Sequence, residues 1–477
     1  MSKLNPLVID VDGTLIHNDL THELLLLGFC SSPLKGLTYV KEGLRSKNGL
    51  KEMLVSSIGD KIDVTNLPYN ETIIDFAKAE AQRGREIVLC SGSHEFLIDK
   101  IADHFDWVDA AYATNADVNL TSKNKAAFLT EKYPDGFDYI GNSTQDYEVW
   151  KVADKAYSVE APAGSQSIRT ASGGSVEPLV EKKTSIKPLL KAMRLHQWAK
   201  NVLLFLVPVL VIDTLGVTDI LPLILGFIGM GLLASGTYLF NDALDIQNDR
   251  SSASKRKRPF ASGKLGLTTG IGLFIACLLG ALIISLILPT LYFVVLMIYF
   301  VTTMTYSVVL KRLVVIDVMT LAFLFLVRVL AGAAIIGVSV SPWLVSFILT
   351  FFLSLSLTKR YTELVKLNEK GRNSMGGRGY DVRDIPLVLG FGMMATATSI
   401  LSFILYGLVA EQPVLASDIS IFIVGFLLVY WMLRLWYLAH RGILDDDPVL
   451  FAVKDKLSIA IGGLIFLVVL AEEFKFF

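Results

Sequence analysis

Residues 265–310 read LGLTTGIGLFIACLLGALIISLILPTLYFVVLMIYFVTTMTYSVVL and contain no charged side chain over 46 positions. A helix needs about 20 apolar residues to cross the hydrocarbon core of a bilayer, so this segment is long enough for two crossings. Pro289 and Thr290 stand near its middle, where a turn would join the two helices. The segment therefore predicts two membrane-spanning helices.

The composition of the whole chain agrees with a membrane protein. Its 477 residues are 53% hydrophobic and 19% charged, with a mean hydropathy of +0.53, which excludes a purely soluble protein. Residues 1–160 hold 16 Lys and Arg against 25 Asp and Glu, whereas the remainder holds 28 against 20. The three cysteines are far apart, which argues against a disulfide framework or a zinc site. An acidic N-terminal part thus precedes a basic membrane part.

The same apolar pattern predicts seven further spans and hence an all-α bundle of nine transmembrane helices. The further spans lie near residues 198–212, 220–240, 316–338, 343–358, 385–410, 419–436 and 457–471. Every second connection lacks Lys and Arg, namely 213–219, 287–291, 337–342 and 409–418. The positive-inside rule then places the basic loops and the N-terminal part in the cytoplasm of a bacterial inner membrane, with the C-terminus outside.

The N-terminal part has the pattern of an α/β domain. Residues 7–14 read LVIDVDGT, and short apolar runs such as 87–90 alternate with helical patterns such as 72–82. This alternation predicts a parallel, Rossmann-like sheet over residues 1–160, with a small helical cap at about 17–70. Residues 161–185 are rich in Ala, Gly and Ser, which predicts a flexible linker to a membrane domain at 186–477.

Two carboxylates, Asp10 and Asp12, follow the first predicted strand, at the end of a sheet where ligands bind. One can act as nucleophile and the other as acid and base, with magnesium offsetting their repulsion. These residues and later motifs in order resemble the haloacid dehalogenase superfamily of phosphatases. The resemblance implies that Asp10 forms an aspartyl-phosphate and that Asp12 transfers protons. It also implies that Thr14 and Ser91 bind phosphate, that Lys125 neutralises charge, and that Asp10, Asp12, Asn142 and Asp146 hold magnesium.

Asn142 departs from that family, which usually has an acidic residue there. An amide oxygen can ligate magnesium but lacks the negative charge that holds the ion, so we expect weaker binding. Two interpretations stay open: an active phosphatase, or a degenerate domain that binds phosphate or serves as a scaffold.

A second acidic motif, NDALDIQNDR at 241–250, follows the second predicted span. Asp242, Asp245 and Asp249 are spaced by three and four, which places them on one face of a helix beside Asn241. Aligned acids at a membrane edge are typical of a site for magnesium and a diphosphate. A solvated helix end explains three aligned acids poorly, especially before the basic run at 255–258.

This NDxxDxxxD pattern, with KRPFASG at 257–263, resembles the UbiA superfamily of intramembrane prenyltransferases. Three motifs resemble its branch of polyprenyl-phosphate phosphoribosyltransferases, such as decaprenyl-phosphate phosphoribosyltransferase: RLHQWAKN at 194–201, YSVVLKR at 306–312 with Asp317, and KRYTE at 359–363. Lys359 and Arg360 stand where ordinary members carry a second aspartate-rich motif. Cations suit a phosphate monoester, so the expected donor is phosphoribosyl diphosphate and the expected acceptor is a polyprenyl phosphate lipid in the bilayer.

In this interpretation the three aspartates are catalytic and hold magnesium on the diphosphate. The expected substrate-binding residues are Asn241, Lys200, Asn201, Arg258, Tyr306, Lys311, Lys359 and Arg360. Asp317 and Glu363 either orient ribose hydroxyls or pair with a nearby cation. Arg328 lies inside a predicted span and needs a partner there, for which Asp317 is a distant candidate.

Two other functions stay open. One is a prenyltransferase that uses isoprenyl diphosphate and an aromatic acceptor. The other is a transporter or lipid-binding protein with a phosphate-sensing domain, although transporters usually place polar groups near the midplane of the membrane. We expect no nucleic acid among the partners, and an oligomer remains open.

Overall fold

The computed structural model describes residues 4–31, 33–115, 118–181, 185–252, 255–375, 378–409, 417–444 and 447–473. The chain divides into two compact units. Unit 1 comprises Met1–Met193 and Leu239–Leu273, and unit 2 comprises Arg194–Tyr238 and Phe274–Phe477. This division differs from the predicted boundary, because residues after the second predicted span belong to the same unit as the N-terminal part.

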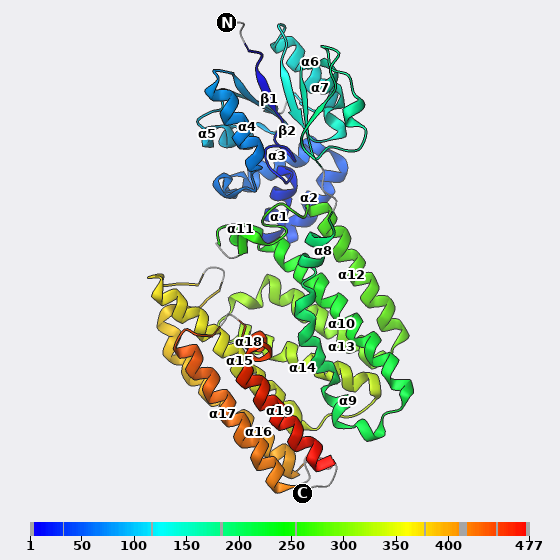
Figure 1. Ribbon diagram of the computed structural model, residues 1–477, viewed down its shortest axis with the longest axis vertical. Helices are drawn as coiled ribbons and strands as arrows, with labels where there is room; N and C mark the ends of the chain where they lie inside the picture. Colours follow the sequence, from blue (N-terminus) through cyan, green and yellow to red (C-terminus); the bar gives the residue numbers. More distant parts are fainter. Residues whose placement is uncertain are drawn as a thin grey trace. The chain divides into compact units, whose positions relative to one another are not determined.

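Unit 1 contains a six-stranded sheet of order β3-β2-β1-β4-β5-β6 (Figure 1). All neighbouring strands are parallel, which confirms the predicted parallel sheet. The strands are β1 (Leu7–Ile9), β2 (Ile87–His94), β3 (Ala110–Thr114), β4 (Asp138–Gly141), β5 (Ala156–Val159) and β6 (Glu177–Val180). Because β1 lies between β2 and β4, the residues that follow it lie at the middle of the carboxyl edge.

Both faces of the sheet are covered by helices. Leu7 and Ile9 pack in one core with residues of α4 (Glu71–Gln82) and α5 (Glu95–His104). Val8 points to the opposite face, as alternation along a strand requires, and packs with residues of α6 (Ser122–Lys132) and α7 (Tyr147–Val152). Burial on both faces explains why β1 is apolar at every position.

The predicted linker at 161–185 includes two short regular elements. It contains the short helix η4 (Ser165–Ser167) and the strand β6, which pairs in parallel with β5. β6 has only four residues, includes Pro178 and is partly exposed. An edge strand tolerates proline and polar residues, so the sequence carries no apolar run that would reveal it.

Unit 1 has two further groups of helices. Between β1 and α4, in the interval of the predicted cap, lie α1 (Leu20–Ser31), α2 (Pro33–Arg45), α3 (Lys47–Ile58), η1 (Gly59–Lys61) and η2 (Val64–Asn66). A separate short helix, η3 (Thr144–Asp146), follows β4. The segment after the second predicted span adds α11 (Ile246–Arg250), η7 (Lys255–Lys257) and the start of α12 (Leu267–Ile287).

Among the described residues, seven helices are long and apolar enough to cross a membrane. They are α10 (Val217–Leu244), α12, α13 (Thr290–Val308), α14 (Ile316–Ile336), α15 (Pro342–Glu369), α16 (Ile385–Val409) and α17 (Asp418–His440). The predicted count of nine is not confirmed. The first predicted span forms the 3₁₀ helix η5 (Leu195–Phe205) and then α9 (Leu206–Leu210), and the last forms α19 (Lys456–Glu473), which carries charges at its ends.

Small residues allow α14 to lie deep in the core of unit 2. A Cβ atom on Gly332 would come within 1.7 Å of the carbonyl oxygen of Leu204 in η5. The backbones of the two helices are therefore in direct contact, which is the packing that glycine permits between membrane helices.

Candidate functional site

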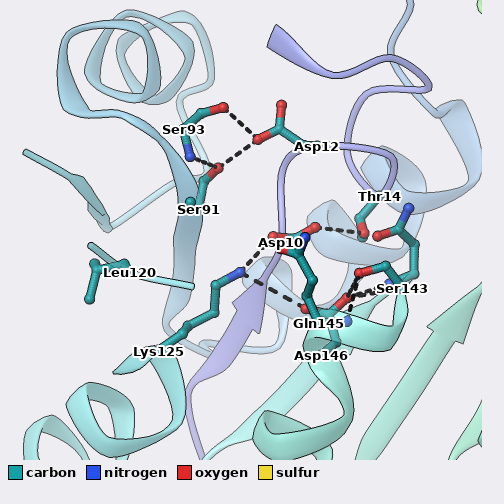
Figure 2. A network of polar contacts seen from close by, with 12 residues as sticks. Asp10, Asp12, Thr14, Ser91, Ser93, Leu120, Lys125, Ser143, Gln145 and Asp146 are labelled. Atoms are coloured by element: carbon teal, nitrogen blue, oxygen red, sulfur yellow. Dashed lines mark hydrogen bonds and ion pairs between the residues drawn. The ribbon is translucent and has the colours of Figure 1, made fainter. Parts of the chain in front are cut away.

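Asp10 lies at the carboxyl edge of the sheet in a network of polar contacts (Figure 2). Its Oδ1 accepts a 2.7 Å hydrogen bond from Nζ of Lys125 on α6, and its Oδ2 accepts one of 3.2 Å from Oγ1 of Thr14. Burial raises the pKa of Asp10 to about 7, and the ammonium group of Lys125 opposes that rise. The contact with Lys125 therefore favours the ionised carboxylate, the form that can act as a nucleophile.

Asp12 has different partners. Its Oδ2 accepts hydrogen bonds from Oγ of Ser91 at 3.0 Å and of Ser93 at 2.6 Å, and its Oδ1 accepts one from the backbone N–H of Leu20 at 2.8 Å. Burial raises the pKa of Asp12 to about 6. These hydrogen-bond donors are neutral, whereas Asp10 contacts a cation, so the two carboxyl groups are suited to different roles in proton and group transfer.

Asp146 organises the loop that follows β4. Its Oδ2 accepts hydrogen bonds from the backbone N–H groups of Asn142 and Ser143, at 3.0 and 2.9 Å. Its Oδ1 accepts a 2.7 Å hydrogen bond from the hydroxyl of Tyr139, which in turn accepts one from Lys125 at 3.1 Å. Asp146 thus fixes both the loop and, through Tyr139, the position of Lys125.

Asn142 lies against Gly13, the residue after Asp12. A Cβ atom on Gly13 would come within 2.0 Å of Nδ2 of Asn142, and the φ angle of Gly13 is +76°. Both facts require glycine at this turn. The structure therefore brings Asn142 to the same edge as the two carboxylates.

These residues share one cavity of about 890 Å³, which we call the N-terminal cavity. The predicted magnesium ligands of unit 1 that line it are Asp10, Asp12, Asn142 and Asp146. In the described part of the chain, no three His, Cys, Asp or Glu side chains are grouped so that they could hold a metal ion. Magnesium binding here stays a prediction.

The aspartate-rich motif is not one continuous helix. α10 ends at Leu244 and α11 begins at Ile246, with Asp245 between them, although a backbone hydrogen bond of 2.8 Å still joins Asp249 to Asp245. Asp245 accepts a 3.2 Å hydrogen bond from Nδ2 of Asn241. The expectation of three acids on one face is therefore only partly correct.

Asp242 and Asp249 are both buried and converge on Arg258. Nη1 of Arg258 lies 3.1 Å from Oδ1 of Asp242 and 2.7 Å from Oδ2 of Asp249. Burial raises the pKa of Asp249, and Arg258 opposes the rise. A single cationic nitrogen thus lies between two carboxylates, and carboxylate oxygens are the ligands that magnesium prefers.

In unit 2, the predicted phosphate contact Lys200 forms an ion pair with Asp447, and the charge of the predicted contact Lys359 also acts on that carboxylate. Nζ of Lys200 lies 2.5 Å from Oδ2 of Asp447, which caps α18 (Pro448–Lys454). Burial alone would raise the pKa of Asp447, but Lys200 and Lys359 lower it below its usual value. The two lysines therefore act on one carboxylate.

Arg328, on α14, has partners other than the one we expected. Its Nε donates to Oδ1 of Asn201 at 3.0 Å, its Nη2 to the hydroxyl of Tyr299 at 2.8 Å and its Nη1 to the carbonyl of Leu324 at 2.6 Å. Asp317, the distant candidate, is not among these partners. Asn201 is fully buried and holds the guanidinium from η5.

Asp317, Arg360 and Glu363 pair with one another. Arg360 is 0% exposed, lies 2.7 Å from Asp317 and also forms an ion pair with Glu363. Asp317 further accepts a 2.6 Å hydrogen bond from the hydroxyl of Tyr380. The alternative of pairing with a cation is thus the one observed for both acids, and the burial of Arg360 does not support a phosphate contact. The two remaining predicted residues, Tyr306 on α13 and Lys311 on η8 (Leu310–Arg312), are partly exposed.

Several residues of these networks were not predicted. Ser93 had a usable signal, because a residue two positions after Ser91 on a strand lies on the same face. Tyr139 and Asp447 had none, since they meet Lys125 and Lys200 across 14 and 247 positions of sequence.

Residues 202–458 match the model of the UbiA prenyltransferase family. The uncharacterized protein y4nM of Sinorhizobium fredii is 34% identical over 468 residues, which are 96% of this chain and 89% of that protein. Decaprenyl-phosphate phosphoribosyltransferase of Mycolicibacterium smegmatis is 30% identical over 187 residues, which are 38% of this chain and 58% of that enzyme. A solved structure of a UbiA homologue from Archaeoglobus fulgidus, bound to GPP and Mg2+, is 16% identical and covers 59% of this chain and 99% of that chain, with a TM-score of 0.45.

Proposed function

Because the chain belongs to the UbiA prenyltransferase family, we propose that it transfers 5-phosphoribose from phosphoribosyl diphosphate to a polyprenyl phosphate in the membrane. The observation that carries this proposal is the convergence of Asp242 and Asp249 on one cationic nitrogen. A diphosphate donor needs such a cation site for its leaving group. The 30% identity to decaprenyl-phosphate phosphoribosyltransferase supports phosphoribosyl diphosphate as the donor.

Asp242 and Asp249 would hold magnesium, with Asp245 and Asn241 beside them. The ion supplies positive charge that stabilises the departing diphosphate. Arg258 contacts both acids and would pass from the carboxylates to the phosphates of the donor, since a guanidinium binds either group in the same way. Lys200 and Lys359 of unit 2 are the chain's expected contacts for a phosphate group.

The transfer itself needs no general base. An oxygen of the lipid phosphate, already anionic at neutral pH, forms a bond to C1 of the ribose. The bond between C1 and the diphosphate oxygen breaks, and the diphosphate leaves with that electron pair. Catalysis then consists of positioning C1 and stabilising negative charge on the leaving group.

For the N-terminal cavity we propose a phosphatase that removes the 5-phosphate of the lipid product. Oδ of Asp10 would attack phosphorus while the bond to the ester oxygen breaks, and Asp12 would give its proton to that oxygen. Water would then attack phosphorus and give a proton to Asp12, while the bond between Oδ of Asp10 and phosphorus breaks, which frees the carboxylate and releases inorganic phosphate. The raised pKa of Asp12 supports its role as the acid. Joining both activities in one chain would raise the effective concentration of the second site to roughly the millimolar range.

The test is product identification. Purified full-length protein is incubated with phosphoribosyl diphosphate, a polyprenyl phosphate and magnesium, and the lipids are analysed by mass spectrometry. We expect lipid-linked ribose from the natural sequence and lipid-linked 5-phosphoribose from Asp10→Asn.

Three results would contradict the proposal. Label passing from isoprenyl diphosphate to an aromatic acid, with none from phosphoribosyl diphosphate to lipid, would show a prenyltransferase of the other kind. Full function without magnesium in Asp242→Asn and Asp249→Asn would favour a transporter or lipid-binding protein. If the unmodified protein accumulates lipid-linked 5-phosphoribose, the domain that holds the N-terminal cavity is a scaffold and not a phosphatase.

A further inference from the structure

The N-terminal cavity has a wall that comes from the membrane part of the sequence. We call residues 245–252 and 255–266 the inter-span loop, because they connect α10 and α12. The cavity holds Asp10 and Asp12, and its lining also includes Ile246, Phe260, Gly266, Leu267 and Thr268. All of these residues belong to unit 1. The carboxylates and the inter-span loop therefore face one space.

A buried ion pair fixes the inter-span loop to the helix α1. Nη1 and Nη2 of Arg250 donate to the two carboxylate oxygens of Glu23 at 3.0 and 2.7 Å, and both side chains are at most 5% exposed. Nε of Arg250 also donates to the carbonyl of Ala261 at 3.1 Å, and Asn18 donates to Glu23 at 2.7 Å. A buried pair requires such full satisfaction, because removing one partner leaves an uncompensated charge.

A second close contact joins the inter-span loop to the segment between β1 and α1. A Cβ atom on Gly263 would come within 2.5 Å of Cβ of His17, and the φ angle of Gly263 is +72°. Only glycine allows this approach in this conformation. The two contacts lie 13 residues apart along the loop, so the loop is held at both ends of its path along the cavity.

The helix that carries Glu23 also holds Asp12. The backbone N–H of Leu20, at the start of α1, donates to Oδ1 of Asp12 at 2.8 Å, and Glu23 lies one turn further along the same helix. Arg250 therefore contacts, through Glu23, the element that orients Asp12. Figure 1 shows α1 and α11 as neighbours in unit 1.

From these contacts we infer that the inter-span loop determines the substrate specificity of the N-terminal cavity, and that the Glu23–Arg250 pair positions it. The substrate is a phosphate monoester whose alcohol is attached to a membrane lipid. Leu267 begins α12, a helix of 21 residues that is long enough to span a bilayer. A monoester bound at Asp10 thus has its other end beside the start of a spanning helix, where an attached lipid can remain in the membrane. This inference rests on the proposed phosphatase function.

The experiment compares two substrates on full-length protein in lipid nanodiscs: a polyprenylphosphoryl 5-phosphoribose and free ribose 5-phosphate. Release of inorganic phosphate gives kcat/KM for each. We expect Arg250→Ala to lower kcat/KM for the lipid-linked substrate by at least about tenfold more than for ribose 5-phosphate, whose smaller loss reports the effect of α1 on Asp12. Reversing the pair, with Glu23→Arg and Arg250→Glu together, should restore part of the preference for the lipid-linked substrate.

The controls separate specificity from folding. Arg256→Ala removes an exposed arginine from the same loop and should change neither value. Phe260→Ala alters the wall without removing the ion pair, so it tests the inference even where Arg250→Ala unfolds the protein, and it should also lower only the lipid-linked value. Equal losses on both substrates, or no preference for the lipid-linked one in the natural sequence, overturn the inference but leave the phosphatase intact. No phosphate release from either substrate overturns the phosphatase function and the inference with it.

Discussion

Asp10 and Asp12 show how neighbouring residues with the same side chain acquire different properties. Asp10 is buried, Asp12 is half-buried and both have a raised pKa, but Asp10 contacts the ammonium of Lys125, whereas Asp12 accepts hydrogen bonds from serine hydroxyls and a backbone amide. The spacing of two residues was visible in the sequence. The identity of the partners was not, because they come from β2, α1 and α6.

Replacing Asp10 by Asn tests its role as nucleophile. An amide cannot form the aspartyl-phosphate, so we expect phosphate release to fall by at least about a thousandfold. Asp63→Asn is the matched control, because Asp63 caps η2 at an exposed position. Phosphate release is measured under identical conditions for both. Retention of more than a tenth of the activity in Asp10→Asn would exclude this nucleophile.

Replacing Arg258 by Ala tests the cation site. The change leaves Asp242 and Asp249 buried without their shared guanidinium, so in the presence of a chelator we expect a loss of about 1–3 kcal/mol in stability. Magnesium should restore much of this loss and raise the Tm of the variant more than that of the natural sequence. Thermal unfolding with and without magnesium gives both values. Arg256→Ala, which removes an exposed arginine two residues before Arg258, should show neither effect. An equal response of Arg258→Ala and the natural sequence to magnesium would argue against a cation between these two acids.

At the scale of elements, the contact between η5 and α14 explains a glycine that the sequence did not single out. The carbonyl of Leu204 occupies the space that a Cβ atom on Gly332 would need. We expect Gly332→Ala to lower the free energy of unfolding by about 1–3 kcal/mol, because neither backbone can move aside without losing packing. Gly272→Ala on α12 is the control, since no atom lies within 4 Å of its added Cβ. Thermal unfolding in detergent compares the two, and equal Tm values would show that η5 moves freely against α14.

The elements that could be predicted from sequence are those with a continuous local pattern. The apolar run at 265–310 gave α12 and α13, and the alternation near Asp10 gave the parallel sheet. β6 was missed because an edge strand with Pro178 has no apolar pattern to recognise. The candidate site divides in the same way. The acids of local motifs could be proposed from the sequence, whereas the burial of Arg360 beside Asp317 could not, because it depends on packing between distant segments.

At the scale of the whole molecule, the segment Leu195–Leu210 determines on which side of the membrane α10 begins. It has fewer residues than the usual spanning α-helix. However, 3₁₀ geometry rises about 2.0 Å per residue, so the 11 residues of η5 cover about 22 Å and the 5 of α9 add about 7.5 Å. The sum of about 30 Å equals the hydrocarbon thickness, so this short segment is able to cross.

A labelling experiment tests this crossing. In a protein without its native cysteines, Thr214→Cys reports on the segment after α9, and Arg256→Cys reports on the inter-span loop. If Leu195–Leu210 crosses and the basic loops are cytoplasmic, a membrane-impermeant maleimide should label Thr214→Cys in intact cells, and Arg256→Cys only after permeabilisation. Labelling of Thr214→Cys only after permeabilisation would mean that the segment enters and leaves the membrane on the same side. α10 would then begin on the cytoplasmic side, and the aspartate-rich motif and the basic loops after it would all lie outside, contrary to the positive-inside rule.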